Sequence, residues 1–297
     1  PDYLVNEPLK EKYAAITSKE ARALADDKVR FYEHCTRHGI ATANILALIA
    51  PAKTEGNSVS HLYSTQELEQ VLVPGEYFIK PSNGSHGVGA FSLVVGDSGL
   101  KWAGRSGSFE DFFQYCVSAL KDARALIVQP KLSNHQQIRN FTRAKGLSTI
   151  RVCTVRKSGS INVIGACMRI IVGESEVDNF SHGAGGNLVA AVDVDNGRLV
   201  TARGSRSRVW PEMTHVDQHP SSGTQIVGLA LPYWPEVLAL VKKAHESIET
   251  LHTVGWDVAI TDAGPVIVEA NWRYDIDILQ VGYMKGYKQV IQENLGF

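Results

Sequence analysis

The sequence predicts an α+β protein with antiparallel sheets, arranged in two lobes that divide near residue 130. Three strand patterns support this prediction: a strand–glycine loop–strand segment at 77–95, a mostly β stretch at 148–201, and a strand–turn–strand segment at 256–270. Short turns between successive strands favour antiparallel pairing, and helical patterns separate these segments. The length of 297 residues also suits two domains at the usual ~150 residues each.

The composition is that of an ordinary globular protein, with 44% hydrophobic and 21% charged residues. Lys and Arg total 30 and Asp and Glu total 31, a balance that argues against a generally basic nucleic-acid binder. The four cysteines lie far apart without a CxxC pair, so we expect neither a zinc site nor a disulfide framework. The sequence has no apolar run of membrane-spanning length and no secretory h-region, which predicts a cytoplasmic protein.

The first lobe is expected to begin with a long helix and to continue as a small sheet. A helix is predicted over residues 18–37, because Ser18 is a good N-cap and Gly39 is a stop signal. The further elements expected in this lobe are an apolar segment at 40–50, helices at 65–72 and 109–120, and strands at 77–81, 90–95 and 125–130.

The second lobe is expected to be mostly β until a strong amphipathic helix at 233–251. A polar, irregular stretch at 211–224 is expected to form a surface loop. The further elements expected here are strands at 149–156, 162–172, 188–194 and 198–202, a hairpin of strands 256–261 and 265–270, and a final helix near 283–293.

A glycine-rich loop, residues 82–89, joins the first two strong strands. Its glycines let the backbone approach a ligand and expose N–H groups to phosphate oxygens, although a plain hairpin turn explains them equally well. Lys80 lies on an otherwise apolar strand just before this loop, and a lysine there favours phosphate binding. The strand–loop–strand order differs from the strand–loop–helix order of Walker A and Rossmann sites.

The last predicted hairpin carries a group of oxygen-bearing side chains. Glu269 and Asn271 lie two residues apart on one strand and therefore share a face, which Asp257 joins if the two strands pair. Oxygen ligands without His or Cys suit Mg²⁺, which keeps waters and takes further ligands from phosphates. The alternative is a set of idle, solvated residues at a strand end, but Glu269 follows an apolar run, where an isolated carboxylate is costly.

The middle of the chain is locally basic, since eleven Lys and Arg face five Asp and Glu between Arg139 and Arg208. Arg151 and Arg169 lie among apolar strand residues, where a guanidinium can hold a carboxylate or phosphate in a bidentate fork. The alternative for both is a structural ion pair.

A polar, glycine-dense loop at 178–187 lies between two of these strands, as loops that cover active sites do, although ordinary long hairpin loops look similar. His182 in this loop is either an acid or base near neutral pH or, more simply, a solvated side chain. No serine sits in a GxSxG elbow, so a hydrolase triad has no support.

Taken together, these features resemble the ATP-grasp superfamily over about residues 25–290. The motifs follow in order: Asp27-Lys28 at a helix start, Phe78-Ile79-Lys80-Pro81 with the glycine-rich loop, Ile127 to Leu132, Asp257, and Glu269-Ala270-Asn271. Further motifs resemble the sugar-transfer-associated group of this superfamily: Ser148 to Val152, the Arg169 strand, Asp178-Asn179-Phe180 and Gly185-Gly186-Asn187.

The resemblance implies an ATP-grasp fold, in which two α+β lobes with antiparallel sheets clasp a nucleotide. It implies an N-terminal extension at 1–24, an N-terminal lobe at 25–130 and a C-terminal lobe at 131–297. ATP and Mg²⁺ are the implied cofactors. The implied ATP contacts are Lys28, Lys80, Gly84, Ser85, His86, Gly87, Val88, Gly89, Gln129, Pro130, Lys131 and Leu132. The implied Mg²⁺ ligands are Asp257, Glu269 and Asn271, and the expected substrate contacts are Arg151, Arg169, Asn179, His182 and Asn187.

The sequence departs from the family pattern in three places. Only 27 residues precede Lys28, where most ATP-grasp ligases carry a further domain, so the substrate is left open. D-alanine ligases place an arginine two residues before the metal-binding aspartate, where this sequence has Gly255. Arg273, in a Trp-Arg-Tyr-Asp segment that replaces the usual small-Pro-Gly turn, is a candidate replacement and joins Arg151 and Arg169 as an expected catalytic residue.

The leading hypothesis is an ATP-dependent carboxylate–amine ligase that forms an amide through an acyl phosphate, in natural-product or polysaccharide biosynthesis. Its expected partners are a small-molecule carboxylate and an amine, without nucleic acid or membrane. The alternatives are a phosphotransferase on the same scaffold and a non-catalytic nucleotide-binding module.

Overall fold

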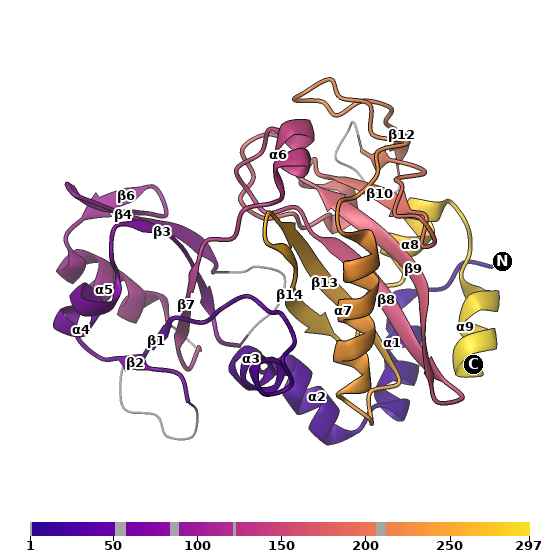
Figure 1. Ribbon diagram of the computed structural model, residues 1–297, viewed down its shortest axis with the longest axis horizontal. Coiled ribbons are helices and arrows are strands. Elements are labelled where there is room, and N and C mark those ends of the chain that lie inside the picture. The colour runs from indigo at the N-terminus through magenta and orange to yellow at the C-terminus, as the bar shows by residue number, and fades with distance from the viewer. Residues whose placement is uncertain (1, 51–57, 84–88, 121–122, 206–211) are drawn as a thin grey trace. The chain divides into compact units, whose positions relative to one another are not determined.

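The computed structural model describes residues 2–50, 58–83, 89–120, 123–205 and 212–297 (Figure 1). The chain divides into two compact units. Unit 1 comprises Pro1–Ala25, His38–Ala41 and Ser133–Phe297, and unit 2 comprises Asp26–Arg37 and Thr42–Leu132. No helix in the described ranges is long and apolar enough to cross a membrane.

Unit 2 is built on a sheet with the strand order β2-β1-β7-β3-β4-β5-β6, in which every pair except β1–β2 is antiparallel. Its strands are β1 (Ala47–Ile49), β2 (His61–Leu62), β3 (Gly75–Pro81), β4 (Phe91–Gly96), β5 (Gly99–Trp102), β6 (Arg105–Gly107) and β7 (Leu126–Pro130). Its helices are α3 (Lys28–Arg37), α4 (Thr65–Val71) and α5 (Phe109–Ala119).

Side-chain alternation along these strands creates two cores in unit 2. On one face, Ile79 and Val128 pack with Leu68 of α4 and Phe112 of α5. On the other face, Ile127 packs with Val29 of α3, together with Leu48 of β1.

Unit 1 is built on a second sheet with the order β12-β11-β10-β9-β8-β13-β14, in which all neighbours are antiparallel. Its strands are β8 (Ile150–Lys157), β9 (Ser160–Ile170), β10 (Leu188–Val192), β11 (Arg203–Gly204), β12 (Thr214–His215), β13 (Thr253–Thr261) and β14 (Gly264–Asn271). The remaining helices are α1 (Asn6–Ile16), α2 (Lys19–Asp26), α6 (Gln136–Thr142), α7 (Trp234–Glu246), α8 (Asp277–Tyr283), α9 (Lys288–Leu295) and the 3₁₀ helix η1 (Ser181–Gly183).

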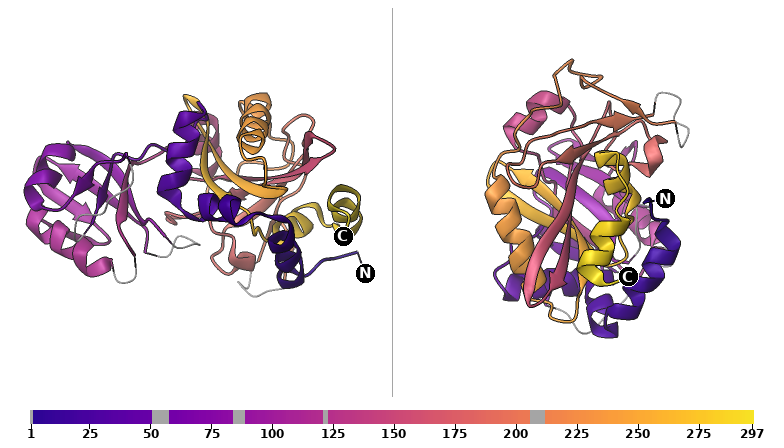
Figure 2. Two further views of the ribbon diagram at one scale, coloured as in Figure 1. Left: turned by 90° about the horizontal axis from the view of Figure 1, so that it is seen from below. Right: turned by 90° about the vertical axis from the view of Figure 1, so that its right-hand side faces the viewer.

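Helices cover both faces of the unit 1 sheet (Figure 2). Helix α7 packs against β8, β9, β13 and β14 on one face. On the opposite face, Cys153 of β8 and Cys167 of β9 pack in one cluster with Tyr13 of α1, Leu279 of α8 and Ile291 of α9. The central strands are therefore buried on both faces, and every residue of β13 up to Ile260 is buried.

The predicted α+β class with antiparallel sheets is confirmed, as are the two hairpins β3–β4 and β13–β14. Helices α4 and α5 begin where expected, because Ser64 and Ser108 cap them through their side chains. The N-cap role of Ser18 is also confirmed, since its Oγ accepts a hydrogen bond from Ala21 N at 3.1 Å.

The prediction of one helix over 18–37 is wrong. The chain forms α2 and α3 instead, because the Asp27 carboxylate accepts hydrogen bonds from Val29 N and Arg30 N, both at 3.0 Å, and so starts a new helix. The helix predicted over 233–251 ends earlier, at Glu246, where Ser247 is the C-cap.

The prediction of a strand at 198–202 is also wrong. Residues Arg198 and Leu199 form only isolated bridges, and the next strand is β11. The final helix begins later than expected, at Lys288, after the unpredicted helix α8. Met284 separates the two helices with a left-handed φ of 54°.

Residues 2–24, which belong to the N-terminal extension expected at 1–24, contain the unpredicted helix α1 and pack within unit 1. Tyr13 is fully buried and its ring stacks on Tyr274 with centroids 4.9 Å apart. Leu4 N and O both bond the Gln280 amide, at 2.7 and 2.9 Å. These contacts make the segment part of the unit 1 core.

Candidate active site

The β13–β14 hairpin brings three oxygen-bearing side chains together. Asp257 pairs in register with Glu269, and Gly255 pairs with Asn271. These positions share one face of the sheet because alternate residues point the same way. Asn271 Nδ2 donates to Asp257 Oδ2 at 3.3 Å, and Asp257 is 4% exposed. The hairpin pattern in the sequence therefore located this group of side chains.

Arg151 reaches the same carboxylate from β8, the strand on the other side of β13. It lies opposite Asp257 in register, and its Nε donates to Asp257 Oδ1 at 2.5 Å while Nη2 donates to Oδ2 at 3.2 Å. Gly255 makes room for this side chain, since a Cβ at residue 255 would lie 2.8 Å from Arg151 Cδ. The guanidinium thus takes a path that only a glycine on β13 leaves open.

Arg169 joins the group from β9. Its Nη2 lies 2.9 Å from Asp257 Oδ2, and its Nε lies 3.3 Å from Asp178 Oδ2. Asp178 also accepts hydrogen bonds from Thr149 N at 2.7 Å and Thr149 Oγ1 at 2.6 Å. The result is a continuous chain of charges, Arg151–Asp257–Arg169–Asp178, at one end of the sheet, which we call the arginine–aspartate chain.

Burial and charge act in opposite directions on the two carboxylates of this chain. Burial raises the pKa of Asp257, but Arg151 and Arg169 outweigh it and hold the pKa below its ordinary value. For Asp178 burial dominates, and the pKa lies above its ordinary value despite the charge of Arg169. Burial lowers the pKa of the Arg151 guanidinium, yet Asp257 and, more weakly, Glu269 raise it overall, so Arg151 stays charged.

Arg151 and Arg169 each have one terminal nitrogen, Nη1, that takes no part in the arginine–aspartate chain. Within the described part of the chain, the bonds of Arg151 use Nε and Nη2, and those of Arg169 use the same two nitrogens. Neither Nη1 is among the described polar atoms that are sealed from solvent without a partner. Toward the described residues, both Nη1 groups therefore remain available as hydrogen-bond donors.

The loop predicted to contact substrate is anchored by Asn187. Its Oδ1 accepts from Val172 N at 3.2 Å, and its Nδ2 donates to Val177 O and Asn179 O, both at 3.1 Å. Asn187 is 2% exposed, so these bonds hold the loop and a substrate contact would require breaking them. Asn179 contributes its carbonyl to this arrangement, and the His182 side chain lies outside the described residues.

For Arg273, the candidate replacement arginine, the described contact is with an aromatic ring. Its guanidinium stacks on the ring of the neighbouring Trp272, with 5.4 Å to the centroid, and the residue is exposed. Arg151 is the side chain that occupies the space beside Gly255. The sequence did not predict Asp178 and Thr149 individually as site residues. Asp178 lies in a polar loop and Thr149 at a strand start, and neither pattern indicates which side chain will contact the residue.

In unit 2, Lys80, Ile127 and Gln129 share a sheet face, because Lys80 pairs in register with Ile127. This is the face on which α3, the helix that Lys28 begins, packs. Gln129 is buried and its Nε2 donates to Ala43 O at 3.0 Å.

The remaining nucleotide contacts implied by the sequence lie around this face. Lys131 N donates to Glu76 O at 2.9 Å beside exposed Pro130 and half-buried Leu132. Gly89 has a φ of 76°, and a Cβ added to it would lie 3.2 Å from Pro81 Cγ. The other predicted contacts of this loop lie outside the described residues: Gly84, Ser85, His86, Gly87 and Val88.

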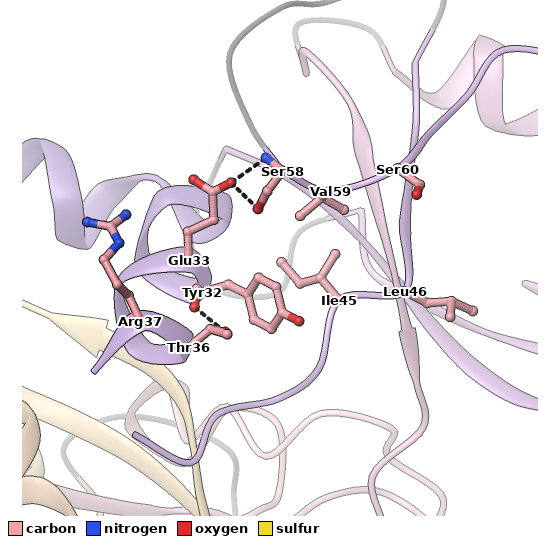
Figure 3. A pocket seen from close by; sticks show the side chains of 9 residues that line it. All are labelled: Tyr32, Glu33, Thr36, Arg37, Ile45, Leu46, Ser58, Val59 and Ser60. Atoms are coloured by element: carbon pink, nitrogen blue, oxygen red, sulfur yellow. Dashed lines mark hydrogen bonds between the residues drawn. The ribbon is translucent and has the colours of Figure 1, made fainter. Parts of the chain in front are cut away.

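A separate pocket of about 530 Å³ lies in unit 2 between α3 and the chain near β1 and β2 (Figure 3). Glu33 lines it and accepts hydrogen bonds from Ser58 N at 2.5 Å and Ser58 Oγ at 2.7 Å. None of the side chains predicted from the sequence lines this pocket.

Two α+β units with mainly antiparallel sheets, one with a lysine-bearing hairpin and the other with an acidic hairpin, fit the ATP-grasp class of fold. The chain matches the family model "Sugar-transfer associated ATP-grasp" over residues 9–294, and it belongs to this family. A search of curated proteins finds no match.

Solved structures align with this chain at low sequence identity. A biotin carboxylase from Campylobacter jejuni, described as a β,γ-ATP complex, aligns with a TM-score of 0.51 and 13% identity over 98% of this chain and 52% of its own. A D-alanine–D-alanine ligase from Helicobacter pylori aligns at 0.49 and 11% over 98% and 65%, and an L-amino acid ligase from Bacillus licheniformis at 0.47 and 12% over 92% and 48%. The chain thus spans between about half and two thirds of the length of these structures.

Proposed function

We propose that this chain is an ATP-dependent ligase that joins a small-molecule carboxylate to an amine through an acyl phosphate. The observation that supports it is the junction at Asp257, where a carboxylate–amide hairpin meets two arginines with available Nη1 donors. Such a junction offers oxygen ligands for a cation on one side and guanidinium donors for an anion on the other. Both are needed where a phosphoryl group is transferred.

The donor chemistry of the hairpin fits Mg²⁺. Asp257, Glu269 and Asn271 present only oxygen ligands from one sheet face, and Mg²⁺ is commonly held by one or two carboxylates with the rest of its ligands from phosphates and water. Within the described ranges, no group of three or more His, Cys, Asp and Glu gathers as a metal site. Bound there, Mg²⁺ would neutralise charge on the phosphates of ATP.

The nucleotide is assigned to unit 2. Lys28 and Lys80 would hold phosphates as point charges, and this is supported by Lys80 lying on the sheet face against which the helix that begins at Lys28 packs. The 84–89 loop would supply further N–H donors. The segment from Gln129 to Leu132 would bind adenine through its backbone, with the Gln129 side chain fixing the segment to Ala43.

The reaction divides into two balanced steps. A carboxylate oxygen of the substrate attacks the γ-phosphorus of ATP, and the bond to the β,γ-bridging oxygen breaks to release ADP. The amine then attacks the acyl carbon, inorganic phosphate leaves, and the nitrogen loses a proton. Arg151 and Arg169 contribute by donating Nη1–H bonds to the carboxylate and to the oxygens of the transferred group, and so by holding both in position.

The proposal is tested by ADP release from MgATP in the presence of amino acids and sugar acids paired with amines, with the product masses measured. We expect one pair to stimulate ADP release and to yield a product whose mass corresponds to loss of water from the two substrates. Glu269→Ala should abolish this release while the circular dichroism spectrum is unchanged. Glu249→Ala, an exposed carboxylate of the same unit, serves as the matched control and should remain active.

Other outcomes would replace this function with a specific alternative. A stable phosphorylated carboxylate without amide would identify a phosphotransferase on the same scaffold. ATP binding in calorimetry without turnover across the panel would favour a non-catalytic nucleotide-binding module. An active, metal-dependent Glu269→Ala variant would contradict the assignment of the hairpin as the metal site.

A further inference from the structure

We propose that Asp178 is a positioning residue that orients Arg169 toward the transferred anion. The proposal rests on the anion-binding role given above to Arg151 and Arg169. It assigns a function to a side chain that is not one of the expected metal ligands, and it links the 173–187 segment to the site.

Asp178 is itself held in a defined place. Asn187 Nδ2 donates to Val177 O and to Asn179 O, the carbonyls on either side of Asp178, both at 3.1 Å. The Asp178 carboxylate then receives Thr149 N and Thr149 Oγ1 at 2.7 and 2.6 Å. A carboxylate fixed through both its backbone and its oxygens is a rigid acceptor for a neighbouring arginine.

Arg169 is fixed at two of its three nitrogens. Its Nε lies 3.3 Å from Asp178 Oδ2 and donates to Thr149 Oγ1 at 3.2 Å, while Nη2 donates to Thr149 Oγ1 at 2.5 Å and lies 2.9 Å from Asp257 Oδ2. Because a guanidinium is planar, fixing Nε and Nη2 also fixes the direction of Nη1. Asp178 is thus one of three anchors, with Thr149 and Asp257, that set where Nη1 points.

The charges of the arginine–aspartate chain balance only when Asp178 is present. Arg151 and Arg169 carry two positive charges, and Asp257 and Asp178 carry two negative ones, all on side chains that are no more than 13% exposed. Without Asp178, Arg169 would have Asp257 as its one carboxylate partner in the chain. The guanidinium would then turn onto Asp257, and Nη1 would lose its direction.

The test is calorimetric titration with inorganic phosphate, in chains that all carry Lys28→Met and Lys80→Met to remove the two lysine contacts to phosphate that are expected in unit 2. We expect Arg169→Met to weaken phosphate binding at least tenfold, and Asp178→Asn to weaken it about tenfold, as expected for loss of a charge-assisted contact. Asn keeps the size and one acceptor oxygen for Thr149, so the loop anchor survives while the charge is lost. Asp262→Asn, which removes an exposed partner of Arg139 in the same unit, is the matched control and should bind phosphate as the parent does.

The double variant Arg169→Met/Asp178→Asn separates positioning from a purely structural role. If Asp178 acts through Arg169, its substitution has no further effect on phosphate binding once Arg169 is absent. Thr149→Val, which removes the hydroxyl between the two side chains, gives a second readout if Asp178→Asn does not fold, and it should also weaken binding. Binding by Asp178→Asn equal to the parent, an undiminished effect in the double variant, or phosphate binding that does not depend on Arg169 would each overturn the proposal.

This outcome is distinct from that of the proposed ligase activity, because phosphate binding requires no turnover. An Arg169-dependent effect of Asp178 in a chain that never releases ADP would disprove the ligase and leave the positioning role standing. Amide formation with an unaffected Asp178→Asn variant would do the reverse.

Discussion

Two aspartates of the β13–β14 hairpin, Asp257 and Asp262, each form an ion pair with an arginine from elsewhere in unit 1. The surroundings of the two ion pairs differ. Asp257 meets Arg151 at 2.5 Å with the two side chains 6% and 10% exposed, whereas Asp262 meets Arg139 at 2.8 Å with side chains 57% and 38% exposed. The pKa of both carboxylates is lowered, but for Asp257 the arginines must first overcome burial, while for Asp262 the hydrogen bonds of Arg139 and Gln136 N suffice.

The comparison shows that the same pairing has different consequences at different depths. Water screens the exposed pair and replaces either partner at little cost. The buried pair leaves a charge without a partner when one member is removed, which is strongly destabilising. The buried pair therefore constrains which residues can surround it. Substitutions at the buried pair should cost more stability than substitutions at the exposed pair.

The largest effect is expected for Asp257→Ala. It leaves Arg151 and Arg169 buried without their shared acceptor, so we expect a loss of about 3–5 kcal/mol in the free energy of unfolding. Urea denaturation followed by circular dichroism measures this loss. A variant as stable as the parent would show that the pair is not needed for the fold.

Burial also separates two histidines of unit 1. His245 is fully buried, accepts Thr154 Oγ1–H at Nδ1 at 2.7 Å and donates Nε2–H to Leu251 O at 2.7 Å; burial lowers its pKa to about 4. Because the folded pKa lies below the unfolded value of about 6.5, stability is complete above pH 6.5 and falls as the pH drops toward 4, by up to about 3 kcal/mol.

The measurement is urea denaturation between pH 7 and pH 4. A His245→Gln variant, if it folds, should lose part of the pH dependence, whereas His215→Gln, at an exposed histidine bonded to Asp217, should retain it. Equal pH dependence in parent and His245→Gln would assign the acid sensitivity to other groups.

A smaller loss is expected for Gly255→Ala. The added Cβ would lie 2.8 Å from Arg151 Cδ and 2.8 Å from Tyr274 Cβ, so Arg151 must leave its path to Asp257. Overpacking of this kind costs about 1–3 kcal/mol of stability, measured by urea denaturation. The ligase activity, once assigned, should fall further than stability alone explains. Gly75→Ala, at a strand glycine of unit 2 where the added Cβ would meet nothing closer than 3.8 Å, is the control and should retain the parent's stability.

The smallest effect is expected for Asp262→Ala. The salt bridge to Arg139 is exposed to solvent on both sides, so its removal should leave the urea midpoint and ADP release unchanged. A loss comparable to that of Asp257→Ala would remove the distinction between the two pairs.

The sequence predicted the hairpin side chains well and their partners poorly. Asp257, Glu269 and Asn271 follow from strand alternation and a short turn, which are local properties. The partner of Arg151 was left open between a ligand and an ion pair, because its strand precedes β13 by about 100 residues and register between distant strands has no local signal. Helical periodicity missed the break at Asp27, which the family motif Asp27-Lys28 had marked as a helix start, since an aspartate within a helical pattern serves either as a surface residue or as a cap.

By itself, the sequence determined the α+β class, the two hairpins and the family motifs, because periodicity and turn residues act over a few residues. Tertiary structure alone decided that Gly255 leaves a path for Arg151, that Asp178 meets Arg169, and that residues 2–24 pack into unit 1. These outcomes depend on which strands and helices become neighbours. Which strands and helices become neighbours depends on the apolar surface that each arrangement buries. That burial is a property of whole sheet and helix faces in the folded chain and not of single residues.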